Sequence, residues 1–335
     1  MQQNWKQCLN DAYNTHAKAC GKPRRRIKLP SGISFVGDGK EVQLSLSANC
    51  VTANMQSNEA AFEGWSLALR RWCEVEVVLQ WTPPPADATK PQLQHYQRFL
   101  YRGARFQSLF DWFHIEPDCA ARVPAALALS GGSLYLNVGD DRDSVQKSSA
   151  EDKAERVLEL WLLNKPEFAA HYGFANGTRD RHLPVGLFSG PTPTRASQIF
   201  PGGQASIDLI GLSADTLWLF ELKAGKNIPA GTITELFFYT SVIRDALCGG
   251  PFNFAQPRPE ALIQPEALKR VARIEGVMLG HDIHPLLDSG LISILNDAVD
   301  ARWNAEPCRA HVHFRAERVS QKAQAEDRLD IATVD

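Results

Sequence analysis

The chain has 335 residues, 36 lysines and arginines against 38 aspartates and glutamates, and a formal net charge of −2, which excludes a strongly basic protein but not a local basic groove. Its length exceeds the usual size of one hydrophobic core, so we expect two domains. We expect no membrane span or signal peptide, because no run of about 18 apolar residues occurs. Seven cysteines without a C-x-x-C pair argue against a disulfide framework or a structural zinc site and favour a reducing cytoplasm.

Residues 1–147 form the first expected domain, a mixed α+β unit whose role, recognition or regulation, the sequence leaves open. Its pattern predicts strands at 42–46, 73–81 and 133–139, a Pro-rich loop at 82–91 and a helix at 92–113.

Positive charge gathers at two places in this first domain. The run "KPRRRIK" at 22–28 is dense enough to engage a phosphate backbone, although short charge runs are more often solvated loops. In the helix at 92–113, Arg98, Arg102 and Arg105 share one face. An aromatic stripe on another face of this helix is more typical of core than of a base-stacking platform.

A polar segment at 138–153 separates this domain from residues 148–335. The second domain begins with a helix at 151–168 and continues with a strand at 182–188. After these come a β-hairpin at 206–223, a helix at 232–247, a strand at 273–280, a helix at 284–297 and a strand at 309–317. Strands alternating with helices predict an α/β fold, a sheet with helices packed over its faces.

The hairpin carries charges inside otherwise apolar runs. With Ala214 and Asp215 as the central turn residues, Asp208 would stand opposite Glu221, and Lys223 would point to the same side of the sheet. Two carboxylates in this position repel each other, and a divalent cation would offset the repulsion.

The element order αβββαβ, with an aspartate on the second strand and E-x-K on the third, resembles the PD-(D/E)XK nuclease superfamily, the restriction-endonuclease-like fold. The resemblance covers roughly residues 150–290, and Ile207 stands where the family motif has proline. It implies a restriction-endonuclease-like core and a metal-dependent nuclease in the cytoplasm. Such an enzyme hydrolyses phosphodiester bonds, with DNA favoured over RNA as the partner.

The resemblance also implies roles for individual residues. Asp208, Glu221 and the Leu222 carbonyl would hold magnesium or manganese, and Lys223 would orient water and offset charge in the transition state. Many members add a glutamate from the first helix, for which Glu155 and Glu159 are both candidates because they share one helical face.

Three further features leave alternatives open. Glu235 and Tyr239 resemble a Q-x-x-x-Y element of some nucleases, but a capping box formed by Thr232 and Glu235 is the favoured interpretation. Lys226 is a candidate for phosphate contact. The histidines lack a recognisable catalytic setting. The alternative function is a non-catalytic nucleic-acid-binding or scaffold protein that retains the nuclease fold.

Overall fold

The computed structural model describes residues 4–21, 27–123, 132–135, 150–175, 178–190, 194–201, 206–224, 229–254 and 264–334. The chain is a mixed α/β protein that divides into two compact units. Unit 1 consists of Met1–Ala128, Pro229–Thr234 and His284–Ala298, and unit 2 of Leu129–Ile228, Glu235–Ile283 and Val299–Asp335. Two segments of the expected second domain thus belong to unit 1, and most of the polar segment at 138–153 lies outside the described residues.

Unit 1 contains a four-stranded sheet in the order β1-β2-β3-β4, formed by β1 (Ile33–Gly37), β2 (Glu41–Leu46), β3 (Glu76–Trp81) and β4 (Phe113–Ile115). Strands β1 and β2 are antiparallel, and the other two pairs are parallel. The helices of this unit include α1 (Trp5–Ala19), α2 (Ala48–Val51), α3 (Phe62–Cys73), α4 (Lys90–Leu109) and α5 (Pro117–Ala120). Helices α1 and α3 and strand β1 were not predicted from the sequence.

Helix α4 is shorter than predicted, and two of its arginines are buried. It ends at Leu109, and Phe113, predicted to be helical, starts β4. The aromatic stripe is core as expected, since Phe99 and Phe106 are buried. Arg98 and Arg102 are also buried, so these two arginines do not form the exposed basic face that the spacing suggested.

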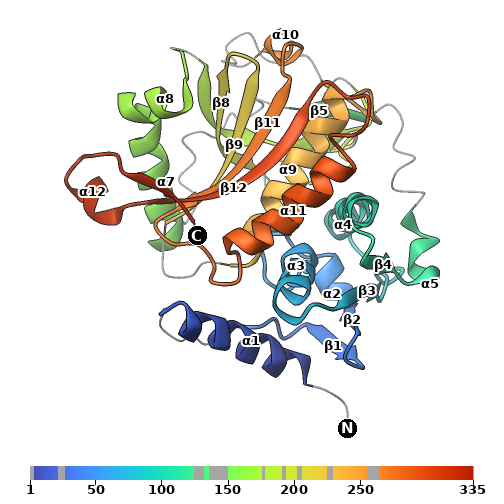
Figure 1. Ribbon diagram of the computed structural model, residues 1–335. Coiled ribbons are helices and arrows are strands. Elements are labelled where there is room, and N and C mark those ends of the chain that lie inside the picture. Colours follow the sequence, from blue (N-terminus) through green and yellow to red (C-terminus); the bar gives the residue numbers. More distant parts are fainter. Residues whose placement is uncertain are drawn as a thin grey trace. The chain divides into compact units, whose positions relative to one another are not determined.

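Unit 2 contains a six-stranded sheet in the order β13-β12-β11-β9-β8-β6 (Figure 1). Its strands are β6 (Arg179–Pro184), β8 (Ser206–Ser213), β9 (Thr216–Lys223), β11 (Arg273–Gly280), β12 (His311–Val319) and β13 (Ile331–Thr333). Strand β11 pairs in parallel with both β9 and β12, and the other neighbours are antiparallel. A three-stranded sheet joins β10 (Phe252–Phe254), β5 (Gly132–Tyr135) and β7 (Gly186–Phe188).

The helices that accompany these strands follow the predicted order closely. They are α7 (Ala150–Asn164), α8 (Pro166–Tyr172), α9 (Gly231–Leu247), α10 (Pro265–Leu268) and α12 (Gln321–Ala325). Most of the next helix in chain order after α10, α11 (Ser289–Ala301), belongs to unit 1. The helix expected at 151–168 is two helices, because Pro166 cannot continue α7 and instead begins α8.

The two faces of the six-stranded sheet are covered by different helices. Leu158 of α7 and Phe168 of α8 pack on a core that includes Leu209, Phe220 and Leu222 of the hairpin, so the side predicted to be apolar is core. On the other face α9 approaches Gly276 so closely that a Cβ there would lie 3.1 Å from the Thr240 hydroxyl and 3.2 Å from Leu236.

Unit 2 also contains a covalent link that the sequence analysis argued against. Cys248, which follows α9, and Cys308, which precedes β12, form a disulfide with Cα atoms 5.2 Å apart. The two cysteines are 60 positions apart and carry no spacing motif, so pattern reasoning had no signal for the pair. The other five cysteines form no disulfide.

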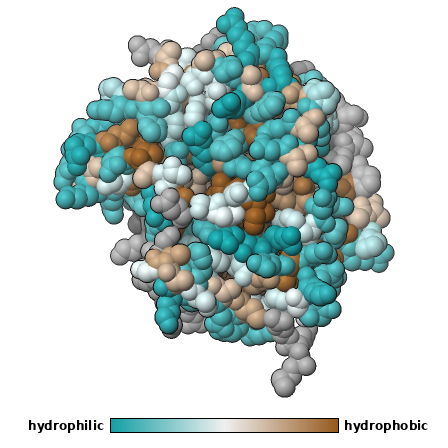
Figure 2. Space-filling view, viewed as in Figure 1, coloured by the Kyte–Doolittle hydropathy of each residue, from teal (hydrophilic) through white to brown (hydrophobic). Residues whose placement is uncertain are grey.

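The surface has few large apolar side chains. In the part of the chain that the structure describes, Val36, Leu93 and Val157 are the exposed large hydrophobic residues. Figure 2 accordingly shows apolar residues only in small patches among hydrophilic ones on the face it presents. Among the described residues, none of the helices combines the length and the apolar composition that a membrane crossing requires.

Candidate functional site: a carboxylate cluster around Lys223

The β8-β9 hairpin holds the predicted site residues and has the predicted register near its turn. Ser213 pairs with Thr216 and Leu212 with Leu217, and the ladder continues through the pair Leu209–Phe220. The turn therefore consists of Ala214 and Asp215, as expected, with Ala214 at a positive φ of 50°.

Beyond Leu209 the two strands no longer pair as the sequence analysis assumed. Asp208 is not a ladder partner of Glu221, because its Oδ2 accepts the backbone N–H of Leu222 at 2.7 Å instead. The half-buried side chain of Asp208 therefore lies between the strands and takes the place of a backbone acceptor. Leu222 is fully buried, and the metal-binding role expected for its carbonyl stays a prediction.

Lys223 is the cation around which the carboxylates gather. Its ammonium lies 2.7 Å from Glu221 Oε1, 3.7 Å from Glu155 Oε1 and 4.0 Å from Glu235 Oε2. Asp208 interacts electrostatically with the same ammonium. Two strands and two helices thus bring four carboxyl groups to one lysine, and all five residues belong to unit 2.

Several oxygens of the Lys223 cluster accept no hydrogen bond from the described residues. Glu221 Oε2 and both carboxyl oxygens of Glu235 are buried and accept no hydrogen bond from a described residue. The capping box expected for Glu235 is therefore wrong, because the Thr232 N–H donates to the Pro229 carbonyl and not to Glu235. Glu235 is the fourth residue after Gly231, which begins α9. From this position its carboxylate reaches Lys223 at the end of β9.

The crowding of charge shifts the pKa of three groups in the cluster. Burial raises the pKa of Asp208 to about 7, and nearby Glu155 and Glu235 act in the same direction against Lys223. Burial, followed by the charges of Asp208 and Glu235, raises the pKa of Glu221 well above its ordinary value. Burial alone would lower the pKa of Lys223, but the surrounding carboxylates, Glu221 foremost, raise it well above its usual range.

The structure distinguishes the two glutamates proposed from the first helix. Glu155 reaches Lys223, whereas the Glu159 carboxylate lies 3.2 Å from Arg181 Nη1 on β6. Both stand on α7, but Glu159 is one turn further along and is almost completely buried. Glu155 is therefore the member of the pair that belongs to the cluster.

The carboxylates of the cluster could supply two oxygen ligands to a hard divalent cation but not a complete ligand set. In the described ranges no group of three or more His, Cys, Asp or Glu side chains is arranged to hold a metal ion. Magnesium, however, commonly binds through one or two carboxylates, with water and substrate phosphate as its other ligands. Asp208 and Glu221 provide such a pair, and the partnerless Glu221 Oε2 is an oxygen that a cation would satisfy.

Other candidates from the sequence fall elsewhere. Lys226 and most of the basic run at 22–28 lie outside the described residues. His281 donates its backbone N–H to the Lys223 carbonyl at 3.1 Å, and its ring contacts Gln324. Glu235 was predicted to be a helix cap because the spacing Thr-x-x-Glu is visible in a short stretch of sequence. Its contact with Lys223 joins two separate elements, and no short pattern indicates it.

Comparisons of the chain with protein-family models, with curated protein sequences and with solved structures gave no match. The site is therefore interpreted from its own geometry.

Proposed function

We propose that the protein is a metal-dependent nuclease that hydrolyses phosphodiester bonds, with DNA favoured over RNA. The observation that carries the proposal is the convergence of Asp208, Glu221 and Lys223 from two adjacent strands. Three buried carboxylate oxygens beside them accept no hydrogen bond from a described residue. The order of elements α7, β6, β8, β9, α9 and β11 supports a restriction-endonuclease-like core, as expected from the resemblance.

Asp208 and Glu221 are the residues that would hold magnesium or manganese. The bound ion would polarise the phosphoryl oxygens and lower the pKa of the attacking water. Glu155 and Glu235 lie 3.7 and 4.0 Å from the Lys223 ammonium and would orient water through hydrogen bonds. Their charge also draws the cation toward the cluster.

Lys223 acts in this proposal as a positive charge and not as a base. Because the surrounding carboxylates raise the pKa of Lys223, its ammonium stays protonated at neutral pH. A fixed ammonium can donate hydrogen bonds to a phosphoryl oxygen and offset the charge that develops in the transition state.

The test is incubation with supercoiled, linear and single-stranded DNA and with RNA, in magnesium, in manganese and in excess chelator. We expect cleavage that needs the metal, and a loss of roughly 100-fold or more in Lys223→Ala. Lys165→Ala is the matched control, because Lys165 lies in the same unit but pairs with Asp327 at 2.5 Å. Cleavage that persists in chelator, or at an unchanged rate in Lys223→Ala, would overturn the proposal.

One observation favours a second candidate, a nucleic-acid-binding or scaffold protein without catalysis. Lys223 and Glu221 already form a 2.7 Å ion pair, so part of the cluster is self-compensated. Under this alternative, wild type and Lys223→Ala would bind nucleic acid equally in chelator and neither would cleave it in magnesium.

A further inference from the structure

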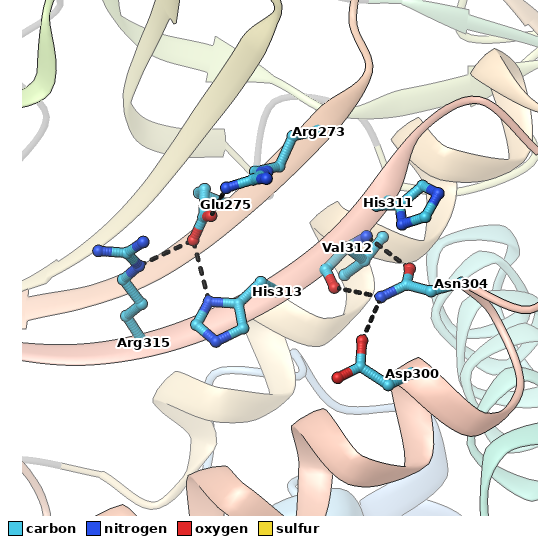
Figure 3. Close-up of a pocket in the computed structure, with 8 residues that line it drawn as sticks. All are labelled: Arg273, Glu275, Asp300, Asn304, His311, Val312, His313 and Arg315. Atoms are coloured by element: carbon cyan, nitrogen blue, oxygen red, sulfur yellow. Dashed lines mark hydrogen bonds and ion pairs between the residues drawn. The ribbon is translucent and has the colours of Figure 1, made fainter.

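A polar pocket of roughly 280 Å³ lies in unit 2 where β11 and β12 begin (Figure 3). Arg273 and Glu275 of β11 stand beside His311 and His313 of β12 in the parallel register. The Lys223 cluster is at the other end of the sheet, since Gly280 pairs with Lys223. At about 3.3 Å per residue, some 20 Å of strand separates the two places, so the pocket is a distinct site.

The buried carboxylate of Glu275 holds the basic side chains of this pocket in place. Glu275 is 2% exposed and accepts from Arg315 Nε at 2.8 Å and from His313 Nδ1 at 3.0 Å. Arg273 Nη1 is 3.8 Å away. Hydrogen bonds from His313 and Arg315 outweigh the effect of burial and lower the pKa of Glu275, so this carboxylate is charged. One carboxylate is thus shared by two guanidinium groups and an imidazole.

The guanidinium of Arg315 is held in place while keeping donors available. Its plane lies over the Trp218 ring, with 5.4 Å to the centroid, and Glu317 is 4.0 Å from Nη1. Of its five N–H groups, the one on Nε is used by Glu275. A fixed guanidinium loses little side-chain entropy when it binds an anion, which favours recognition of a ligand.

Arg273 and His311 add further donors at the mouth of the pocket. The Arg273 side chain is 60% exposed and makes no hydrogen bond to another residue in the described ranges. Figure 3 shows it close to Glu275, with His311 further along β12. The other carboxylate of the pocket, Asp300, already accepts from Asn304 Nδ2 at 2.6 Å.

We propose that this pocket binds a phosphomonoester, either a free nucleotide or the phosphorylated end of a nucleic acid. A tetrahedral phosphate can accept hydrogen bonds from several donors at once, which the two guanidinium groups and His311 can supply. A carboxylate ligand, by contrast, is fully recognised by one guanidinium group through two parallel hydrogen bonds. The volume lies just below the range of drug-sized ligand pockets, which suits a phosphate and part of the group attached to it. The proposal does not depend on the nuclease proposal.

The test is calorimetric titration of the full chain in chelator, with inorganic phosphate, adenosine 5′-monophosphate and adenosine as probes. Phosphate and the nucleotide should bind, and adenosine should not. Arg273→Ala should weaken binding by roughly tenfold, the loss expected for one charge-assisted hydrogen bond. The matched control is Arg318→Ala, because Arg318 is on the neighbouring strand β12, is 48% exposed and pairs with Asp282; its affinity should equal that of wild type.

Two further arms complete the experiment. Arg315→Lys keeps the charge but loses the fork, so it should also weaken binding, and thermal melting checks that each variant is folded. Oligonucleotides with and without a 5′-phosphate identify the source: a preference for the phosphorylated end indicates nucleic acid, and equal binding indicates the free nucleotide. Equal affinity for the nucleotide and adenosine, or unchanged phosphate affinity in both folded variants, would overturn the proposal.

Discussion

Two buried charged clusters of this protein, one in each unit, are built in opposite ways. In unit 1, Arg102 donates to both Glu63 oxygens at 2.7 and 2.6 Å and to the Ala60 carbonyl at 2.7 Å, and the Thr234 hydroxyl donates to Glu63 at 3.1 Å. One cation meets one anion, and both side chains are at most 2% exposed. In unit 2, Lys223 faces four carboxyl groups, and three of their buried oxygens accept no hydrogen bond from a described residue.

The difference distinguishes an ion pair with its hydrogen bonds satisfied from a cluster in which several buried oxygens accept no hydrogen bond from a described residue. Buried charges are normally paired and hydrogen-bonded, because an unsatisfied buried charge costs several kcal/mol. The pair of Glu63 and Arg102 follows this rule. The Lys223 cluster departs from it, and a departure of this kind is typical of functional sites, where a ligand completes the set of interactions.

The largest effect should come from breaking the satisfied pair. Arg102→Met leaves the Glu63 carboxylate buried without its cation, so we expect a loss of about 3–5 kcal/mol in the free energy of unfolding, measured with urea. Replacing both residues with methionine should recover most of that loss. A loss below about 1 kcal/mol in the single variant would mean that the pair does not stabilise unit 1.

The Lys223 cluster should make stability fall as pH rises. The pKa of Asp208 is about 7 in the folded protein against an ordinary 3.8. Between these values the folded state keeps a proton that the unfolded chain has released, so the free energy of unfolding decreases with pH, by on the order of 1 kcal/mol per unit. The penalty is absent below about pH 4 and complete above about pH 7. Glu221, whose pKa is also raised, acts in the same direction.

Asp208→Asn isolates this contribution. Thermal unfolding from pH 4 to pH 8 in chelator should show a flatter profile for Asp208→Asn than for wild type. An identical slope in the two proteins would show that Asp208 does not carry the raised pKa.

Magnesium should relieve the crowding above pH 7, where Asp208 is ionised. A ligand at 100 times its dissociation constant stabilises the folded state by about 2.7 kcal/mol. We expect a stabilisation of that order in wild type and in the control Glu159→Gln, because Glu159 pairs with Arg181. Asp208→Asn should show none. The prediction fails if sodium chloride at equal ionic strength stabilises as much as magnesium.

The smallest effect is an increase in stability. Glu235→Gln removes one negative charge and supplies an amide N–H that can donate to the partnerless Glu221 Oε2, so the metal-free protein should gain about 1 kcal/mol. Glu63→Gln, the same change in the satisfied pair, should destabilise. If both variants lose stability in chelator melts, Glu235 is a structural residue like Glu63.

Much of unit 2 could be predicted because its signals are local. The turn at Ala214 and Asp215 determines which residues of the hairpin pair, and strand β11 begins and ends where its apolar run does. The first helix was predicted too long, because its apolar spacing continues past Pro166. Unit 1 was harder to predict: α3 is buried on nearly all sides, and it was missed although its apolar residues follow a helical period.

The sequence by itself determined that Asp208, Glu221 and Lys223 share one end of a hairpin, because a tight turn and an alternation of two residues follow from local chemistry alone. Only the tertiary structure decided which other carboxylates join them. Glu155 and Glu159 are equivalent in spacing, and packing of α7 on the sheet brings one to Lys223 and the other to Arg181. Glu235 and the pocket of Arg273 and Arg315 likewise depend on contacts between residues distant in the chain, which no local pattern encodes.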